Sequence, residues 1–301
     1  MAERVINANG VGLCTESFGD PKDPPILLVM GLSASMLWWE DGFCRSLAGY
    51  GRFVIRYDHR DTGRSTTFEP GRPGYSGGDL LADAVAVLDD YGLPAAHLVG
   101  VSAGGALVQL LALDFPSRVL SLVLISTSPA TPGNRRLPPP SAAFSEFVRS
   151  ATVDWSDVDS VIDYVVAYAR MLAGDERCFE EAEVRKLVRR DAARARDFAA
   201  LQNHDLLADD DEPRKPLSSI EAPTLVIHGT ADPMFPLAHG RALAGEIPSA
   251  QLLPLEGAGH GVQQVDWDTI TQAIAAHTSG ENRYRPDVMP PGPDPRCGGS
   301  P

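Results

Sequence analysis

The 301-residue sequence predicts an α/β fold, with a mostly parallel central sheet flanked by helices and a helical cap insertion. Three observations predict it. Short, continuous apolar runs recur along the chain, and each is typical of a strand buried on both faces. Helical patterns follow several of these runs, which indicates a parallel sheet. The alternation stops after residue 127 and resumes near residue 218, so the stretch between them is predicted to be an insertion.

The strands are predicted in chain order. Asn9-Gly10 lies between two alternating runs, and this dipeptide favours a tight type I′ turn, so the chain is expected to open with an antiparallel hairpin. Buried strands are then expected at six runs: PPILLVMG, RFVIRYD, HLVGVS, VLSLVLIS, PTLVIHG and AQLLPLEG.

Helices are predicted between these strands. Apolar residues recur at helical spacing over 79–91, and Gly92 follows as a stop signal. A second helix is expected over 103–115, because the backbone before Pro116 disfavours helix. In the insertion, helical stretches are expected around 144–148, 161–172 and 178–207.

These patterns divide the chain into three parts. Residues 1–127 and 218–277 are predicted to form the α/β core, and residues 128–217 a helical cap. Residues 278–301 are rich in proline and glycine and poor in apolar residues, so they are expected to form a flexible tail. An insertion that leaves from the carboxyl ends of parallel strands can cover a ligand site.

Composition limits the classes of partner. The net charge of −14 disfavours binding to nucleic acid or to an anionic membrane surface. The start MAERVINANGVGLC lacks a signal-peptide pattern. The four cysteines are scattered and are expected to be reduced thiols. We therefore expect a cytoplasmic monomer or weak homo-oligomer that acts on a small molecule.

A candidate nucleophile lies between the third buried strand and the second core helix. The segment Gly100-Val101-Ser102-Ala103-Gly104 fits the pattern G-x-S-x-G. In this pattern a sharp strand-to-helix turn exposes the serine, and small neighbours prevent clashes. The strand and the helix that the pattern requires are both predicted here. The alternative, a turn needed only for packing, is the weaker interpretation.

A serine hydroxyl needs a base, and the base needs an acid to orient it. His260 follows an apolar run in the segment EGAGHG, so a loop after the last strand can bring it over the serine. Asp232 follows the strand TLVIHG directly. The end of the preceding strand offers only hydroxyl side chains at 126–128, which favours Asp232 as the acid.

The other histidines receive structural interpretations. His228 is expected in the core and His59 in a structural turn. His204, His239 and His277 are expected on helices and in contact with solvent.

An oxyanion hole requires two donors that point at the developing charge. The backbone N–H of Ala103 is one candidate, and that of Leu32, next to Gly31, is the other. A substrate pocket is predicted from nearby apolar and aromatic residues: Gly31, Trp38, Trp39, Phe144, Tyr164 and Met171. The alternative for the two tryptophans is packing in the core.

Together the G-x-S-x-G turn, the HGTAD loop, the GAGH loop and the insertion resemble the α/β-hydrolase superfamily. The segments LLVMG, RYDHRDTGRSTT and LADAVAVLD are similar to the aclacinomycin methylesterase group, which tailors anthracyclines. The resemblance implies methyl-ester hydrolysis by Ser102, Asp232 and His260, with Leu32 and Ala103 in the oxyanion hole. It implies no metal or organic cofactor. The insertion departs most from that group.

The predicted function is therefore that of a serine esterase that acts through an acyl-enzyme on a small, apolar, polyketide-type ester. The triad also suits a cofactor-free perhydrolase, a lactonase or a carbon–carbon bond hydrolase. Outside hydrolysis, a ligand-binding protein or a cyclase could use the same fold.

Overall fold

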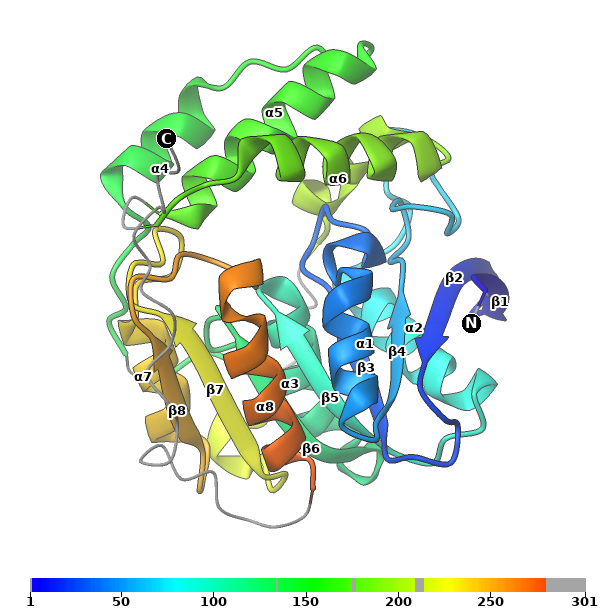
Figure 1. Ribbon diagram of the computed structural model, residues 1–301, viewed down its shortest axis with the longest axis vertical. Coiled ribbons are helices and arrows are strands. Elements are labelled where there is room, and N and C mark those ends of the chain that lie inside the picture. The colour runs from blue at the N-terminus through cyan, green and yellow to red at the C-terminus, as the bar shows by residue number, and fades with distance from the viewer. Residues whose placement is uncertain (1, 134, 175–176, 209–213, 280–301) are drawn as a thin grey trace, which may run out of the picture.

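The computed structural model describes residues 2–133, 135–174, 177–208 and 214–279. In this part of the chain, eight strands form one sheet in the order β1-β2-β4-β3-β5-β6-β7-β8 (Figure 1). The strands are β1 (Arg4–Ala8), β2 (Val11–Phe18), β3 (Pro25–Val29), β4 (Phe53–Tyr57), β5 (Ala96–Val101), β6 (Val119–Ile125), β7 (Thr224–Gly229) and β8 (Gln251–Leu255). The pairs β1–β2 and β2–β4 are antiparallel, and the others are parallel. The predicted mostly parallel sheet is confirmed.

The predicted N-terminal hairpin is present as well. Ala8 pairs with Val11 across a two-residue turn. Asn9 and Gly10 both have positive φ, at 52° and 81°. A type I′ turn needs this conformation at both central positions, and asparagine and glycine adopt it at the lowest cost.

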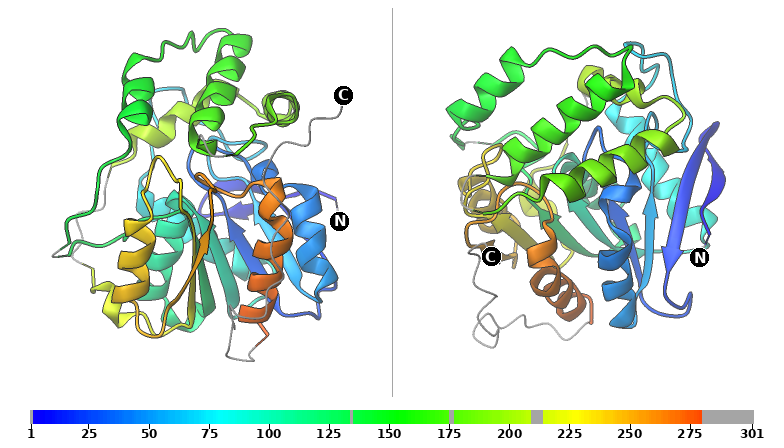
Figure 2. Two further views of the ribbon diagram at one scale, coloured as in Figure 1. Left: turned by 60° about the vertical axis from the view of Figure 1, so that its left-hand side comes forward. Right: turned by 45° about the horizontal axis from the view of Figure 1, so that its top comes forward.

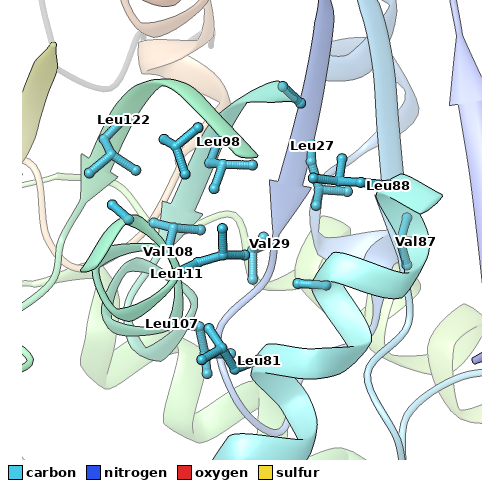
Figure 3. Close-up of a cluster of buried hydrophobic side chains, with 14 of the residues drawn as sticks. Leu27, Val29, Leu81, Val87, Leu88, Leu98, Leu107, Val108, Leu111 and Leu122 are labelled. Carbon is cyan, nitrogen blue, oxygen red and sulfur yellow. The ribbon is translucent and has the colours of Figure 1, made fainter. Parts of the chain in front are cut away.

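Helices cover both faces of the sheet. One face carries α2 (Gly77–Asp90), α3 (Ala103–Asp114) and α7 (Ala238–Glu246), and the other carries α1 (Asp41–Gly49) and α8 (Trp267–His277). Figure 3 shows the first of these cores, where Leu27 and Val29 of β3 meet leucines and valines of α2 and α3. Ile26 and Leu28 of the same strand face the second core. Burial on both faces explains why the strand is apolar throughout.

The helices α2 and α3 are confirmed close to their predicted ends. Tyr91 caps α2, and Gly92 follows with φ of 67°. Helix α1 was not predicted, and α7 and α8 were expected only as helices that carry His239 and His277, without bounds. They are short, of nine to eleven residues, and only three to five of these are buried in each, so each offers few apolar positions that could reveal its bounds.

The insertion forms a helical layer over the carboxyl ends of the parallel strands (Figure 2). We call its four elements the cap: α4 (Ala142–Ser150), α5 (Val158–Ala173), α6 (Glu181–Arg194) and the 3₁₀ segment η3 (Phe198–Leu206). The predicted single stretch over 178–207 is wrong, because Ala195 is extended with ψ of 146° and ends α6. Asp197 then caps a new segment by accepting a hydrogen bond from Ala199 N–H at 3.0 Å.

Four shorter 3₁₀ turns complete the described structure: η1 (Met36–Trp38), η2 (Pro116–Arg118), η4 (Leu217–Ser219) and η5 (Gln264–Asp266). The first of them lies in the loop that follows β3, directly beneath α6.

The cysteines only partly follow the prediction. Cys14 and Cys44 are free, buried thiols. Cys178 is disulfide-bonded, so the expectation of a reduced thiol is wrong for this residue. Cys297 and the predicted tail from residue 280 onward lie outside the described residues. None of the described helices combines the length and apolar character that crossing a membrane requires.

Candidate active site

Ser102 lies at the sharp turn between β5 and α3. Its backbone has φ of 55° and ψ of −125°, a conformation that is strained for any residue with a side chain. Two contacts hold the turn, one from the end of the neighbouring strand β6 and one from the loop that follows it. The Ser102 N–H donates to the carbonyl of Ile125 at 3.0 Å, and the Thr127 hydroxyl donates to the carbonyl of Ser102 at 2.6 Å.

Close backbone packing explains the glycines around this serine. A Cβ on Gly100 would lie 2.4 Å from the carbonyl oxygen of Gly104. A Cβ on Gly104 would lie 2.3 Å from the carbonyl oxygen of Val29, at the end of β3. The start of α3 therefore abuts the two central strands, which fixes where the serine hydroxyl can lie.

His260 and Asp232 are hydrogen-bonded to each other. His260 lies after β8 and Asp232 after β7, and Nδ1 of the imidazole is 2.8 Å from Oδ2 of the carboxylate. The other carboxylate oxygen accepts from the N–H groups of Met234 and Phe235 at 2.9 and 2.8 Å. Burial alone would raise the pKa of Asp232, but the charge and hydrogen bond of His260 lower it.

The ionised carboxylate defines the histidine tautomer. Because a carboxylate only accepts hydrogen bonds, His260 donates from Nδ1, and Nε2 of the neutral ring is left as the base. The cap holds the same loop: the His260 N–H donates to the carbonyl of Leu172 at 2.7 Å, near the end of α5. A Cβ on Gly259 would lie 2.3 Å from the Ala173 backbone, so this loop needs glycine where the cap rests on it.

The two backbone N–H groups proposed for the oxyanion hole are free to bind a ligand. Neither the N–H of Leu32 nor that of Ala103 donates to another residue in the described part of the chain. Ala103 is the first residue of α3, where the positive end of the helix dipole favours an anion. A Cβ on Gly31 would lie 3.2 Å from that of Ser102, so the loop after β3 passes closely over the serine.

Ser102, His260, Leu32 and Ala103 all line one cavity of about 970 Å³ between the core and the cap. This volume is at the upper end of the range for small-molecule sites. Much of its wall is apolar, with aromatic side chains from both layers: Trp38, Trp155, Tyr164, Tyr168, Phe179 and Phe235.

The pocket prediction needs two corrections. Phe144 does not line the cavity, because its ring packs edge-on against Tyr168 inside the cap, with ring centroids 5.6 Å apart. Met171 does not line it either: it lies on α5, where the neighbouring residues Leu172 and Ala173 supply the lining instead. Gly31, Trp38, Trp39 and Tyr164 do line it.

The two predicted tryptophans differ in their surroundings. Trp39 is only 1% exposed and stacks on Phe43 with ring centroids 5.3 Å apart, so it belongs mainly to the core. Trp38 is partly exposed and donates its indole N–H to Asp191 of α6 at 3.2 Å. It therefore joins the cavity wall to the cap.

Several residues near the site were missed or misplaced by sequence reasoning. Thr127 contacts the serine turn and Phe235 contacts the triad acid, but only their positions after strands could have indicated them.

Two histidines were misplaced. His204 and His239 were expected in contact with solvent, yet both are buried, at 3% and 7% exposure. His239 bonds to the Ser128 hydroxyl at 2.9 Å, and His204 reaches the loop after β3. His228 is fully buried, as predicted.

Comparison with known proteins places this geometry in a family. Residues 24–266 match the family described as alpha/beta hydrolase fold. The chain is 34% identical over 293 residues to the rhodomycin D methylesterase DauP of Streptomyces sp. (strain C5), covering 92% of this chain and 98% of that protein. It is also 34% identical over 298 residues to the rhodomycin D methylesterase DnrP of Streptomyces peucetius, with the same coverage.

Solved structures show the same fold. The esterase RhEst1 from Rhodococcus sp. ECU1013 superposes with a TM-score of 0.73 at 24% identity, covering 93% of this chain and 99% of that one. A meta-cleavage product hydrolase from Pseudomonas fluorescens IP01 superposes with a TM-score of 0.71 at 20% identity, covering 93% and 98%.

Proposed function

Because this chain belongs to the alpha/beta hydrolase fold family, we propose that it is a serine esterase with Ser102 as nucleophile, His260 as base and Asp232 as orienting acid. The observation that carries the proposal is the His260–Asp232 hydrogen bond of 2.8 Å, behind an imidazole that shares one cavity with a serine in a strained turn. The two methylesterase relatives support ester hydrolysis as the reaction.

The chemistry is acyl transfer in two steps. Nε2 of His260 takes the proton of the Ser102 hydroxyl as its oxygen attacks the ester carbonyl. The N–H groups of Leu32 and Ala103 stabilise the tetrahedral oxyanion, and His260 then protonates the leaving alcohol. In the second step, water activated by His260 attacks the acyl-enzyme and releases the acid and the free serine. Ionised Asp232 stabilises the imidazolium in both steps.

The substrate we propose is a methyl ester on an anthracycline-type polyketide. The relatives named for rhodomycin D support this class. The cavity is large enough for a polycyclic compound, and rings such as Tyr164 and Tyr168 offer flat apolar surface for stacking. We further propose a cytoplasmic monomer or weak homo-oligomer; the net charge of −14 supports weak self-association, because like-charged copies repel.

Turnover and covalent labelling test this function together. We expect the wild type to hydrolyse short p-nitrophenyl esters and the methyl ester of an anthracycline, and to be labelled at Ser102 by a phosphonate. Ser102→Ala should lose labelling and at least about 10³-fold in kcat, with its melting temperature close to that of the wild type. Mass spectrometry identifies the labelled peptide.

Two results would contradict the proposal. If the wild type neither turns over esters nor is labelled, while it binds the anthracycline tightly, the protein is a binding member of the fold. If Ser102→Ala keeps the wild-type rate, the reaction takes place elsewhere in the molecule.

A further inference from the structure

The loop after β3 contains a strained residue next to the proposed oxyanion donor Leu32. Ser33 has φ of 61°, a left-handed conformation that is costly for serine. The cap holds Ser33 through two hydrogen bonds, and both partners lie on η3. The Ser33 N–H donates to Nδ1 of His204 at 2.6 Å, and the Ser33 hydroxyl donates to the carbonyl of Leu201 at 3.1 Å.

These contacts define the state of His204. Because a backbone N–H only donates, Nδ1 of His204 must carry a lone pair, and the ring proton lies on Nε2. Nε2 is 2.8 Å from the carbonyl of Arg60, which accepts that proton. Burial, together with the nearby His59, lowers the pKa of His204 to about 3, so the ring stays neutral near neutral pH.

A second buried histidine holds the other side of the same loop. Nε2 of His59 lies 2.9 Å from the carbonyl of Met30 and must donate to it. The ring centroids of His59 and His204 are 6.2 Å apart, with the rings nearly perpendicular. The peptide that carries the Leu32 N–H therefore lies between two peptides that are each hydrogen-bonded to an imidazole.

We propose that His204 is a positioning residue for the oxyanion hole: it accepts the Ser33 N–H and thereby aims the Leu32 N–H at the reacting carbonyl oxygen. The inference rests on the proposed function, since it concerns the transition state of that reaction. An oxyanion donor acts only if its direction is fixed before charge develops. A strained turn keeps its direction when surrounding hydrogen bonds over-determine it, and His204 supplies the shortest of these bonds.

Two amide variants separate the hydrogen bonds of His204. The side-chain oxygen of asparagine lies near the position of Nδ1, so His204→Asn can keep the acceptor for Ser33. The side-chain amide of glutamine lies near the position of Nε2, so His204→Gln can keep the bond to Arg60 and loses that acceptor. Comparison of the two variants therefore separates the hydrogen bond to Ser33 from the hydrogen bond to Arg60.

We expect His204→Gln to lower kcat about ten- to a hundredfold with KM within about threefold of wild type, since the loss concerns the transition state. His204→Asn should stay within about threefold of the wild-type kcat. A trifluoromethyl ketone, which adds to the serine and places an oxyanion in the hole, should lose affinity for His204→Gln in parallel with kcat. The matched methyl ketone, which stays uncharged, should bind both variants equally.

The melting temperatures of both variants show whether a loss is merely structural. If both lose kcat and stability to the same extent, or if His204→Gln keeps the wild-type kcat and trifluoromethyl ketone affinity, the positioning role is wrong. A wild type without esterase activity would overturn the proposed function and this inference together. An active wild type with an unaffected His204→Gln overturns the inference alone.

Discussion

At the scale of single residues, the turn at Ser102 depends on the absence of side chains at Gly100 and Gly104. The carbonyl oxygens of Val29 and Met30 lie 2.3 and 2.5 Å from where a Cβ of Gly104 would be. These are backbone atoms at the end of a central strand, so they cannot move without shifting the sheet. Gly245, in contrast, lies in α7 with nothing within 4 Å of such an atom.

This contrast gives a matched prediction. Gly104→Ala should destabilise the protein by about 2 kcal/mol or more and lower esterase activity, because α3 must move away from β3. Gly245→Ala should be neutral or stabilising by up to about 1 kcal/mol, because alanine is the better helix former. Urea denaturation of both variants measures the difference. Equal stabilities would show that the turn can relax.

The residues of the proposed triad could be predicted from sequence because each one lies in the turn or loop that follows a parallel strand. In a parallel sheet such residues meet at one edge, so chain order alone indicates their proximity. His204 could not be predicted in this way. It lies in the short 3₁₀ segment η3, and its partners Ser33 and Arg60 are far away in the chain. Only the docked cap brings them together.

At the scale of elements, helix α6 is joined to the core through a buried acid. Asp191 is 3% exposed and accepts the indole N–H of Trp38 at 3.2 Å. Burial raises the pKa of Asp191 from 3.8 to about 6. The carboxyl therefore binds a proton more tightly in the folded than in the unfolded protein.

The sign of the pH effect follows from this difference. Between about pH 4 and pH 6 the unfolded chain releases the proton of Asp191 first, so its contribution to stability falls as the pH rises. Above pH 6 the ionised, buried carboxyl of Asp191 lowers the free energy of unfolding by about 2 to 3 kcal/mol relative to its protonated form. Asp191→Asn should match the wild type near pH 4 and melt a few degrees higher at pH 7. Thermal unfolding at both pH values measures this.

Asp163→Asn is the control for that experiment. Asp163 lies on α5, is 68% exposed and pairs with Arg185 at the surface. Its substitution should leave the pH dependence of the melting temperature unchanged. A wild type that is more stable than Asp191→Asn at pH 7 would contradict the prediction for the buried acid.

The sequence predicted the helical character of the cap but not where its helices divide. Apolar spacing identified α5, while α6 is dominated by charged residues and buries only Val188 and Asp191. This helix docks through a small apolar cluster around Val188 and through polar contacts such as that of Asp191, and both depend on partners that local periodicity does not reveal. The break at Ala195 was missed for the same reason.

At the scale of the whole molecule, one arginine joins three distant segments. Arg194 at the end of α6 lies 2.7 Å from Asp58, which follows β4, and 2.8 Å from Glu3 before β1. The Asp58 side chain is fully buried, and it also accepts the backbone N–H groups of Met36 and Arg64. The segment before β1, the core and the cap therefore share one ion cluster, in which the Asp58 and Arg194 side chains are buried.

Removing the arginine should affect the whole molecule. Arg194→Ala leaves the carboxylate of Asp58 buried without its cation, and we expect a loss of about 3 to 5 kcal/mol in the free energy of unfolding. Arg149→Ala is the control, because Arg149 is 70% exposed and pairs with Glu146 on the same helix. It should change stability by less than about 0.5 kcal/mol. Chemical denaturation that shows similar losses for both would contradict the role of the cluster.

The attachment of the cap limits how proteins of this kind can diversify by recombination. A transplanted cap without residues equivalent to His204, Asp191 and Arg194 would lack the partners of Ser33, Trp38 and Asp58. In such a chimera the loop that contains Ser33 would lose a hydrogen bond to the cap. The buried carboxylate of Asp58 would lose its cation. We expect a chimera to keep its stability only when both sides of these contacts are exchanged together. Point changes in the cavity wall should therefore alter substrate preference with less loss of stability than exchange of the whole cap.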